Sequence, residues 1–402
     1  MRYTRWGVFA ALLAGAAVVA ALVGTTGGKA APTKKTKVVI GWAYDSSGQM
    51  APFDNPALAA AKIEAAHING LKKGTVTFSI KTCDTQNNNP TKAKSCALDL
   101  LGAGANIIFT TCDVDFATPV VQEAIKRGKL AVSTCIGTDQ MGPKRFGTLG
   151  KLAFSFGNVA QDEGSAMAQY AWSRGWKTAG LATNSLLVYF KNVVTAFEKR
   201  FTQLGGKVLA KESYASFGAN NVGAAVNRLS NKKVDVYVTS TAFAELPAFA
   251  TGFRTLGNNT PILNSWAGDG TYWVPPSGTK VTNYYCVTFA SVFGDDPDPA
   301  VRAMIASLKA AGAQPGTGGF LGGADAVDGV FTAFKRAHGS LKGSVLAAKL
   351  VKFHQVPVLG SKISFSTKWH TVFGRAYRVI KTQNNNAKRV GLVTAKVLPN
   401  IH

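Results

Sequence analysis

Short polar loops that each follow an apolar segment hold the side chains best suited to binding a small molecule. Hydroxyl groups and free backbone N–H groups in such loops can hold a carboxylate. An aspartate can hold an ammonium group through a charge-assisted hydrogen bond. The candidate ligand-binding residues are Ser47, Gln49, Asp113, Asp115, Phe116, Cys135, Gly137, Thr138, Tyr189, Phe243 and Asp269.

Some of these candidates have an equally ordinary structural explanation. Asp269 lies in a Gly-Asp-Gly sequence, which a tight turn also favours. Tyr189 could pack in a core, and core packing is the favoured interpretation for Phe116. The sequence leaves these alternatives open.

The motifs of common catalytic sites are absent. The chain has no G-x-x-x-x-G-K-[ST] phosphate loop and no G-x-S-x-G nucleophile turn. None of its five His residues forms an H-E-x-x-H zinc motif, and no C-x-x-C pair occurs. We therefore expect no enzymatic activity, no metal site and no cofactor, although a catalytic triad assembled from distant residues stays possible at this stage.

The first 31 residues have the pattern of a secretory signal peptide. Arg2 and Arg5 precede an apolar run over 6–23, and small residues lead to Ala30 and Ala31. An uncleaved membrane anchor is the alternative, because the run is close to the shortest that spans a bilayer. No cysteine precedes Cys83, which excludes a lipoprotein. We expect a periplasmic or extracellular protein.

The remaining sequence alternates strand-like and helix-like segments. Strands are expected at 37–42, 75–82, 106–110 and 130–133, with helices at 56–68, 90–101 and 116–127 between them. The rhythm continues with helices at 161–174, 188–204, 219–229 and 243–256 and strands at 178–182, 207–210, 234–239 and 261–264. This alternation predicts an α/β fold of two doubly wound lobes with parallel sheets. Ligands of such sheets bind outside the carboxyl ends of the strands, where the candidate residues lie.

The net charge of the chain is +24, and loss of Arg2, Arg5 and Lys29 with the signal peptide would leave +21. Such a surface attracts anionic polymers or lipid head groups. The basic residues are scattered, however, so a general surface property is the favoured explanation. We expect no nucleic-acid partner, because no basic tract is interleaved with aromatic residues.

Several short segments, taken in order, resemble the branched-chain amino-acid-binding family of ABC-transporter receptors, which have the type I periplasmic-binding fold. The segments are Lys37–Trp42 with its following loop 45–49, His67–Gly70, Cys83-Asp84 before Asn89-Pro90, Trp266–Gly270 and Gly322–Val327. The chain departs from the family at 111–116, where Asp113 and Asp115 would suit a cationic group on the ligand.

The resemblance implies a layout and a function. Residues 32–153 and 292–353 would form lobe 1, and 154–291 and 354–402 would form lobe 2, with crossovers near Phe154, Val292 and His354. A small amino-acid-like or related polar solute would bind between the lobes, which close on a hinge. Asp269 would bind its amino group and Tyr189 would form an aromatic wall. An ABC permease would be the partner of a monomeric receptor; a sensor domain or an exported hydrolase are the alternatives.

The same layout implies a disulfide pattern for the five cysteines. Cys83 and Cys96 would pair, because one ends a strand and the other lies on the next helix. Cys112 and Cys135 would pair at the ends of neighbouring strands, leaving Cys286 free. The main alternative is Cys83–Cys112.

Overall fold

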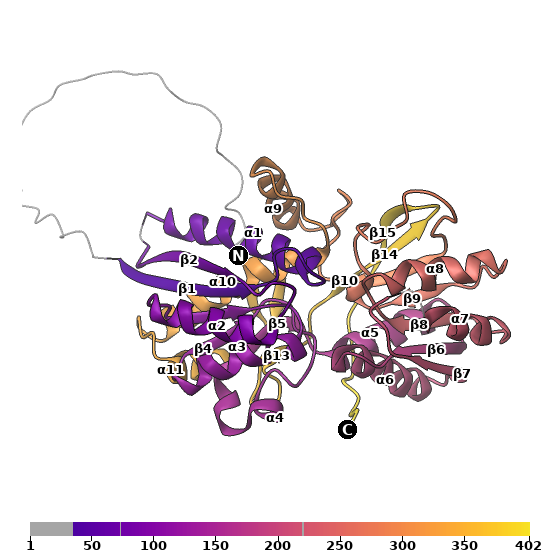
Figure 1. Cartoon of the computed structure of the whole chain (residues 1–402), viewed down its shortest axis with the longest axis horizontal. Coiled ribbons are helices and arrows are strands. Elements are labelled where there is room, and N and C mark those ends of the chain that lie inside the picture. The colour runs from indigo at the N-terminus through magenta and orange to yellow at the C-terminus, as the bar shows by residue number, and fades with distance from the viewer. Residues whose placement is uncertain (1–34, 73, 219–220) are drawn as a thin grey trace, which may run out of the picture.

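Two separate β-sheets, each covered by helices, form two lobes that lie side by side in the computed structural model (Figure 1). The structure describes residues 35–72, 74–218 and 221–402. The expected signal peptide, 1–31, lies outside the described residues. Within the described part of the chain, no helix has the length and apolarity needed to span a membrane.

Lobe 1 is built on a six-stranded sheet with the order β13-β5-β4-β3-β1-β2 and parallel pairing throughout. Its central strands are short apolar segments, IIFT and LAVS, which are buried on both faces as expected of a parallel sheet. The strands are β1 (Thr36–Tyr44), β2 (Val76–Asp84), β3 (Ile107–Thr110), β4 (Leu130–Ser133), β5 (Ala153–Asn158) and β13 (Thr371–Val372).

The helices of lobe 1 begin at residues that suit a helix start. Asn89 caps the first turn of α2 by accepting from the Lys92 backbone N–H, and Pro90 follows it. Figure 1 places α2 and α3 on one side of the sheet, and α10 packs against α1 and β5. The helices are α1 (Ala51–Asn69), α2 (Pro90–Gly102), α3 (Val114–Lys126), α4 (Pro143–Phe146), α9 (Pro299–Ala310), α10 (Leu321–Arg336) and α11 (Gly343–Leu350). A small hairpin of β11 (Val356–Val358) and β12 (Ser361–Ile363) follows α11.

Lobe 2 has a seven-stranded sheet with the order β15-β14-β10-β9-β8-β6-β7. Its pairs are parallel except at β14, which runs antiparallel to β10 and β15. The strands are β6 (Thr178–Asn184), β7 (Lys207–Tyr214), β8 (Val236–Ser240), β9 (Ile262–Asn264), β10 (Tyr284–Thr288), β14 (Tyr377–Gln383) and β15 (Asn386–Val393). The helices are α5 (Ala160–Ser173), α6 (Val188–Gln203), α7 (Val222–Ser230) and α8 (Glu245–Thr255). The predicted α/β fold with two parallel-sheet lobes is confirmed.

The chain crosses between the sheets after β5, after β10 and between β13 and β14. The first crossing therefore comes after Asn158, whereas Phe154 itself is a strand residue of lobe 1. The third lies between Val372 and Tyr377, later than the expected position near His354, because β13 pairs with β5 in the sheet of lobe 1. Residues 354–372, expected in lobe 2, thus lie with lobe 1.

Two disulfides lie within lobe 1, one between β2 and α2 and one between the loops that follow β3 and β4. Cys83 is bonded to Cys96, with 5.5 Å between their Cα atoms, and Cys112 is bonded to Cys135, with 4.8 Å. Cys286 is free and buried in β10. The structure thus contains the expected pairing and not the alternative Cys83–Cys112 bond.

Candidate ligand-binding site

A small cavity lies between the lobes, where strands of both sheets end. Its volume is about 20 Å³, which is room for roughly one water molecule. Lobe 1 lines it with Met50, Phe53, Cys112 and Asp113, and lobe 2 lines it with Leu187, Tyr189, Phe190, Ala242, Phe243, Trp266 and Ala267. The cavity thus lies where a ligand of an open α/β sheet binds, outside the carboxyl ends of the strands.

An aromatic cluster joins the two lobes at this cavity. Phe53, in the first turn of α1, reaches lobe 2 and meets three rings edge to face. Its ring centroid lies 5.1 Å from that of Trp266, 5.8 Å from Tyr272 and 6.4 Å from Phe243. Edge-to-face contacts of this kind stabilise a pair by about 0.5–1.5 kcal/mol beyond the burial of area.

A buried carboxyl group orders the wall on the side of lobe 2. Glu163 on α5 accepts a hydrogen bond from the Tyr189 hydroxyl at 2.8 Å and one from the Trp266 backbone N–H at 2.7 Å. Burial raises the pKa of Glu163 to about 8, although both hydrogen bonds act in the opposite direction. Glu163 therefore carries a proton at neutral pH. It holds Tyr189 and Trp266 in place without adding a negative charge next to the cavity.

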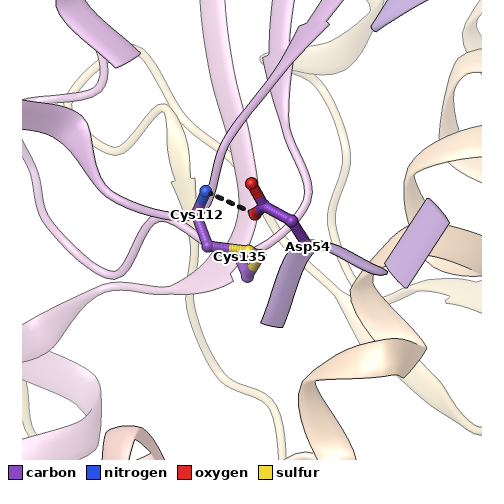
Figure 2. Close-up of side chains that lie close together, drawn as sticks. All are labelled: Asp54, Cys112 and Cys135. Atoms are coloured by element: carbon purple, nitrogen blue, oxygen red, sulfur yellow. Dashed lines mark hydrogen bonds between the residues drawn. A yellow bond between two sulfur atoms is a disulfide. The ribbon is translucent and has the colours of Figure 1, made fainter. Parts of the chain in front are cut away.

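A second buried carboxyl group fixes the wall on the side of lobe 1. Figure 2 shows Asp54 beside the Cys112–Cys135 disulfide, with its carboxylate accepting from the Cys112 backbone N–H at 3.1 Å. Asp54 also accepts from the Thr111 hydroxyl at 2.6 Å and from the Asp45 backbone N–H at 2.9 Å. Burial raises its pKa to about 7. Because both sulfur atoms are in a disulfide, they do not offer the thiolates that a metal would need.

Two aspartates begin α3 and have different roles. Asp113 lines the cavity, is 4% exposed and caps α3 by accepting from the Asp115 backbone N–H at 2.8 Å. Burial and the neighbouring charge of Asp115 raise the pKa of Asp113 to about 7. Asp115 lies outside the cavity lining; it pairs with Arg145 and accepts from the Val188 backbone N–H at 3.2 Å. Val188 is the first residue of α6, so Asp115 links the lobes.

The expected site residues fall into three groups. Asp113, Tyr189 and Phe243 line the cavity. Cys135 and Gly137 contact lining residues: Cys135 is bonded to Cys112, and an added Cβ at Gly137 would lie 2.5 Å from the Tyr189 ring. Thr138 and Phe116 lie outside the lining: Thr138 accepts from Asn192 at 3.0 Å, and the ring of Phe116 lies 6.3 Å from that of Phe217. Ser47, Gln49 and Asp269 lie outside the lining, as Asp115 does.

Local hydrogen bonds explain the positions of the outlying residues. Asp45 accepts from the backbone N–H groups of Gly48, Met50 and Asn87, which turns the loop toward the end of β2 and leaves Ser47 exposed. Asp269 is fully buried and accepts from the Thr288 hydroxyl at 2.5 Å and the Gly318 backbone N–H at 2.6 Å. Both of these donors bind Oδ2, and Oδ1 accepts from the Gly270 backbone N–H at 2.7 Å, so each oxygen atom of the carboxyl group already has a protein donor.

The apolar lining of the cavity was not predicted from the sequence. The missed residues are Met50, Phe53, Cys112, Leu187, Phe190, Ala242, Trp266 and Ala267. Trp266 and Ala267 carried a signal, because they belong to the segment Trp266–Gly270 on which the resemblance depended, and Cys112 was named only as a disulfide partner. Nothing in the sequence separates a ring such as that of Phe53 from an ordinary core residue.

Two parallel-sheet lobes that meet at a buried site between their strand ends define the class of two-lobed binding proteins. The model of the periplasmic binding protein family matches residues 37–387, and the chain belongs to that family. The family consists of binding proteins rather than enzymes. No protein of curated function matches the chain in sequence.

Solved structures of low sequence identity share the fold. The leucine binding protein LivK of Thermotoga maritima is 17% identical, with a TM-score of 0.76 over 89% of this chain and 98% of that one. The branched-chain amino acid binding protein LivJ of Streptococcus pneumoniae, solved with isoleucine, is 18% identical, with a TM-score of 0.74 over 89% and 100%. A solute binding protein of Rhodopseudomonas palustris, solved with benzoate, is 18% identical, with a TM-score of 0.73 over 91% and 98%.

Proposed function

We propose that this protein is an exported, non-catalytic solute-binding protein of an ABC transporter. It works as a monomer in the periplasm or outside the cell, binds one small molecule between its lobes and delivers it to a permease in the cytoplasmic membrane. The observation that carries the proposal is a cavity lined by residues of both lobes at the ends of their strands.

The solute in this proposal is an amino-acid-like or related small molecule with an apolar group. The lining supports an apolar group, because aromatic and aliphatic side chains dominate it. The structural neighbours support a solute of small size, since those compared above are a leucine binding protein and complexes with isoleucine and benzoate. The signal-like pattern at 1–31 supports export.

Closure on the ligand is the test of this function. We expect a compound that binds to raise the melting temperature and, in solution scattering, to reduce the radius of gyration of the protein. Binding at 100 times the dissociation constant stabilises the folded state by about 2.7 kcal/mol. Leucine, isoleucine and benzoate are the first probes.

The matched variants are Trp266→Ala, in the cavity wall, and Trp172→Ala, on α5 of lobe 2 away from the cavity. Trp266→Ala should abolish the thermal shift, whereas Trp172→Ala should retain it. Chemical turnover of the bound compound, or binding without any compaction, would contradict the proposal.

A further inference from the structure

A groove on lobe 2 is separate from the cavity between the lobes. It lies between α5, α6 and residues 392–396, which end β15 and follow it. Its volume is about 520 Å³, and pockets for small molecules typically measure about 300–1,000 Å³. Among the described residues, none lines both the groove and the interlobe cavity. The groove is therefore a second place on this protein with room for a small molecule.

Hydrogen bonds fix the wall of the groove that follows β15. The Gln169 side chain on α5 donates to the Thr394 carbonyl oxygen at 3.2 Å and accepts from the Lys396 backbone N–H at 2.6 Å. Further along, the Lys199 ammonium group on α6 donates to the Asn400 carbonyl oxygen at 2.6 Å. Figure 1 shows this C-terminal segment, in yellow, passing beside α5 and α6. Both helices thus hold the segment that forms the third wall.

The apolar part of the groove is mostly aliphatic. Its partly buried side chains, which pack against the core of lobe 2, are those of Trp172, Leu204, Val393 and Ala395. Leu392 also lines the groove and is 54% exposed, so a large apolar side chain borders on solvent here. The Lys177 ammonium group lies 3.0 Å from the centroid of the Trp172 ring and covers one of its faces. This surface suits an alkyl chain better than a second flat ring.

Two cationic side chains line the groove, those of Arg200 on α6 and Lys396. No aspartate or glutamate is among the described residues of the lining. Nη1 of Arg200 donates to the Gln203 side chain at 3.2 Å, whereas its Nε has no hydrogen-bond partner in the described part of the chain. A guanidinium group binds a carboxylate best through two parallel N–H···O bonds. The edge of Arg200 that includes Nε lacks such an acceptor within the protein.

We propose that this groove is a second binding site, which takes an alkyl carboxylate. The alkyl chain lies on Trp172, Leu204 and Leu392, and the carboxylate binds Arg200 and Lys396. The carboxylate supplies the acceptor that the protein does not provide for Nε of Arg200. Because α5, α6 and β15 all belong to lobe 2, the site goes beyond the proposed function and does not depend on closure of the lobes.

Titration calorimetry with butanoate, hexanoate and octanoate tests the alkyl part of the site. Each added pair of methylene groups should tighten binding by at least about threefold, because the groove removes apolar area from water. Octanol has the same chain without the charge and should bind at least about tenfold more weakly than octanoate. Equal affinities for octanol and octanoate, or no gain with chain length, would overturn the proposal.

Arg200→Gln tests the anionic part, because it removes the charge and keeps a polar side chain. It should weaken octanoate binding by at least about tenfold. Lys191→Gln is the matched control: it removes one positive charge from an exposed position on the same helix, outside the lining, and should leave the affinity unchanged. Equal losses in the two variants would mean that the net charge of the surface attracts octanoate, which would overturn the proposal.

Leu392→Ser provides a second test that does not disturb the core, since this side chain is largely exposed. It should weaken octanoate binding by at least about threefold and leave the melting temperature unchanged. An unchanged octanoate affinity in this variant would contradict an alkyl chain in the groove. Binding to vesicles of anionic lipid without binding of octanoate would also overturn the proposal, because the surface would then face a membrane.

The result is separable from that of the proposed function. Arg200→Gln should retain the thermal shift caused by the solute of the interlobe cavity, and Trp266→Ala, in the wall of that cavity, should retain octanoate binding. Loss of octanoate binding in Trp266→Ala but not in Arg200→Gln would place octanoate between the lobes and overturn the second site. Octanoate binding that depends on Arg200, in a protein that shows no compaction with any solute, would support the groove and contradict the proposed function.

Discussion

Arg378 on β14 and Asp296 in the loop after β10 form a buried ion pair with two parallel hydrogen bonds of 2.9 Å. Their exposures are 4% and 1%. Because Arg378→Met would leave the Asp296 carboxylate buried without its partner, we expect a loss of about 3–5 kcal/mol in the free energy of unfolding. Urea denaturation measures this loss in the free energy of unfolding.

Arg228→Met is the control, because it breaks an exposed ion pair with Glu212 and should lower the free energy of unfolding by under about 1 kcal/mol. Equal losses for the two variants would show that burial of the Arg378–Asp296 pair does not set its contribution.

Individual site residues were predictable only where position along a strand decides their role. Asp113 was expected because it follows a strand end and Tyr189 because of the family resemblance, and both line the cavity. Asp269 follows the same rule, but its Oδ2 accepts from both Thr288 and Gly318, residues that sequence proximity does not bring together. Phe53 was missed because its partners belong to the other lobe, and only the folded arrangement of two sheets brings them to it.

At the level of elements, the contact between the starts of α3 and α6 joins the two lobes. Asp115 of α3 accepts from the first backbone N–H of α6 and also pairs with Arg145 in lobe 1. A carboxylate at a helix N-terminus is stabilised both by this hydrogen bond and by the helix dipole. Asp115→Ala should therefore shift the ligand-free protein toward an open form, seen in scattering as a larger radius of gyration.

Glu212→Ala provides the control for this variant, since Glu212 pairs with Arg228 inside lobe 2 alone. It should leave the radius of gyration unchanged. If Asp115→Ala were as compact as Glu212→Ala, the contact between α3 and α6 would not contribute to closure.

Most helices and strands were predictable, because a long alternation of helix-like and strand-like segments indicates the same elements whatever the tertiary packing. Helices expected at 161–174 and 188–204 are found at Ala160–Ser173 and Val188–Gln203. The short strand β13 was not predictable: it has two residues, and its pairing with β5 depends on a chain return from the hairpin of β11 and β12. The displaced third crossover follows from that omission.

Over the whole molecule, many carboxyl groups are buried beside the hinge and the cavity, and burial raises their pKa values. The pKa rises to about 8 for Glu163, to about 7 for Asp54, Asp113 and Asp162, and to about 6 for Asp269. In the unfolded chain such groups have pKa values of roughly 4. The folded state therefore holds more protons than the unfolded state between about pH 4 and pH 8, and stability must fall as pH rises through this range.

We expect the free energy of unfolding, measured in urea, to be lower at pH 8.5 than at pH 5.5. Asp84 and Asp235 have lowered pKa values, but they gain their stabilising charge below this window. His370 acts in the opposite direction, because burial lowers its pKa, yet it is one group against several. Glu163→Gln removes one of the two carboxyl groups whose pKa burial raises to about 8, the other being Asp325, so its stability should change less between the two pH values than that of the wild type. A stability that rose from pH 5.5 to pH 8.5 would mean that these carboxyl groups are ionised in the folded protein.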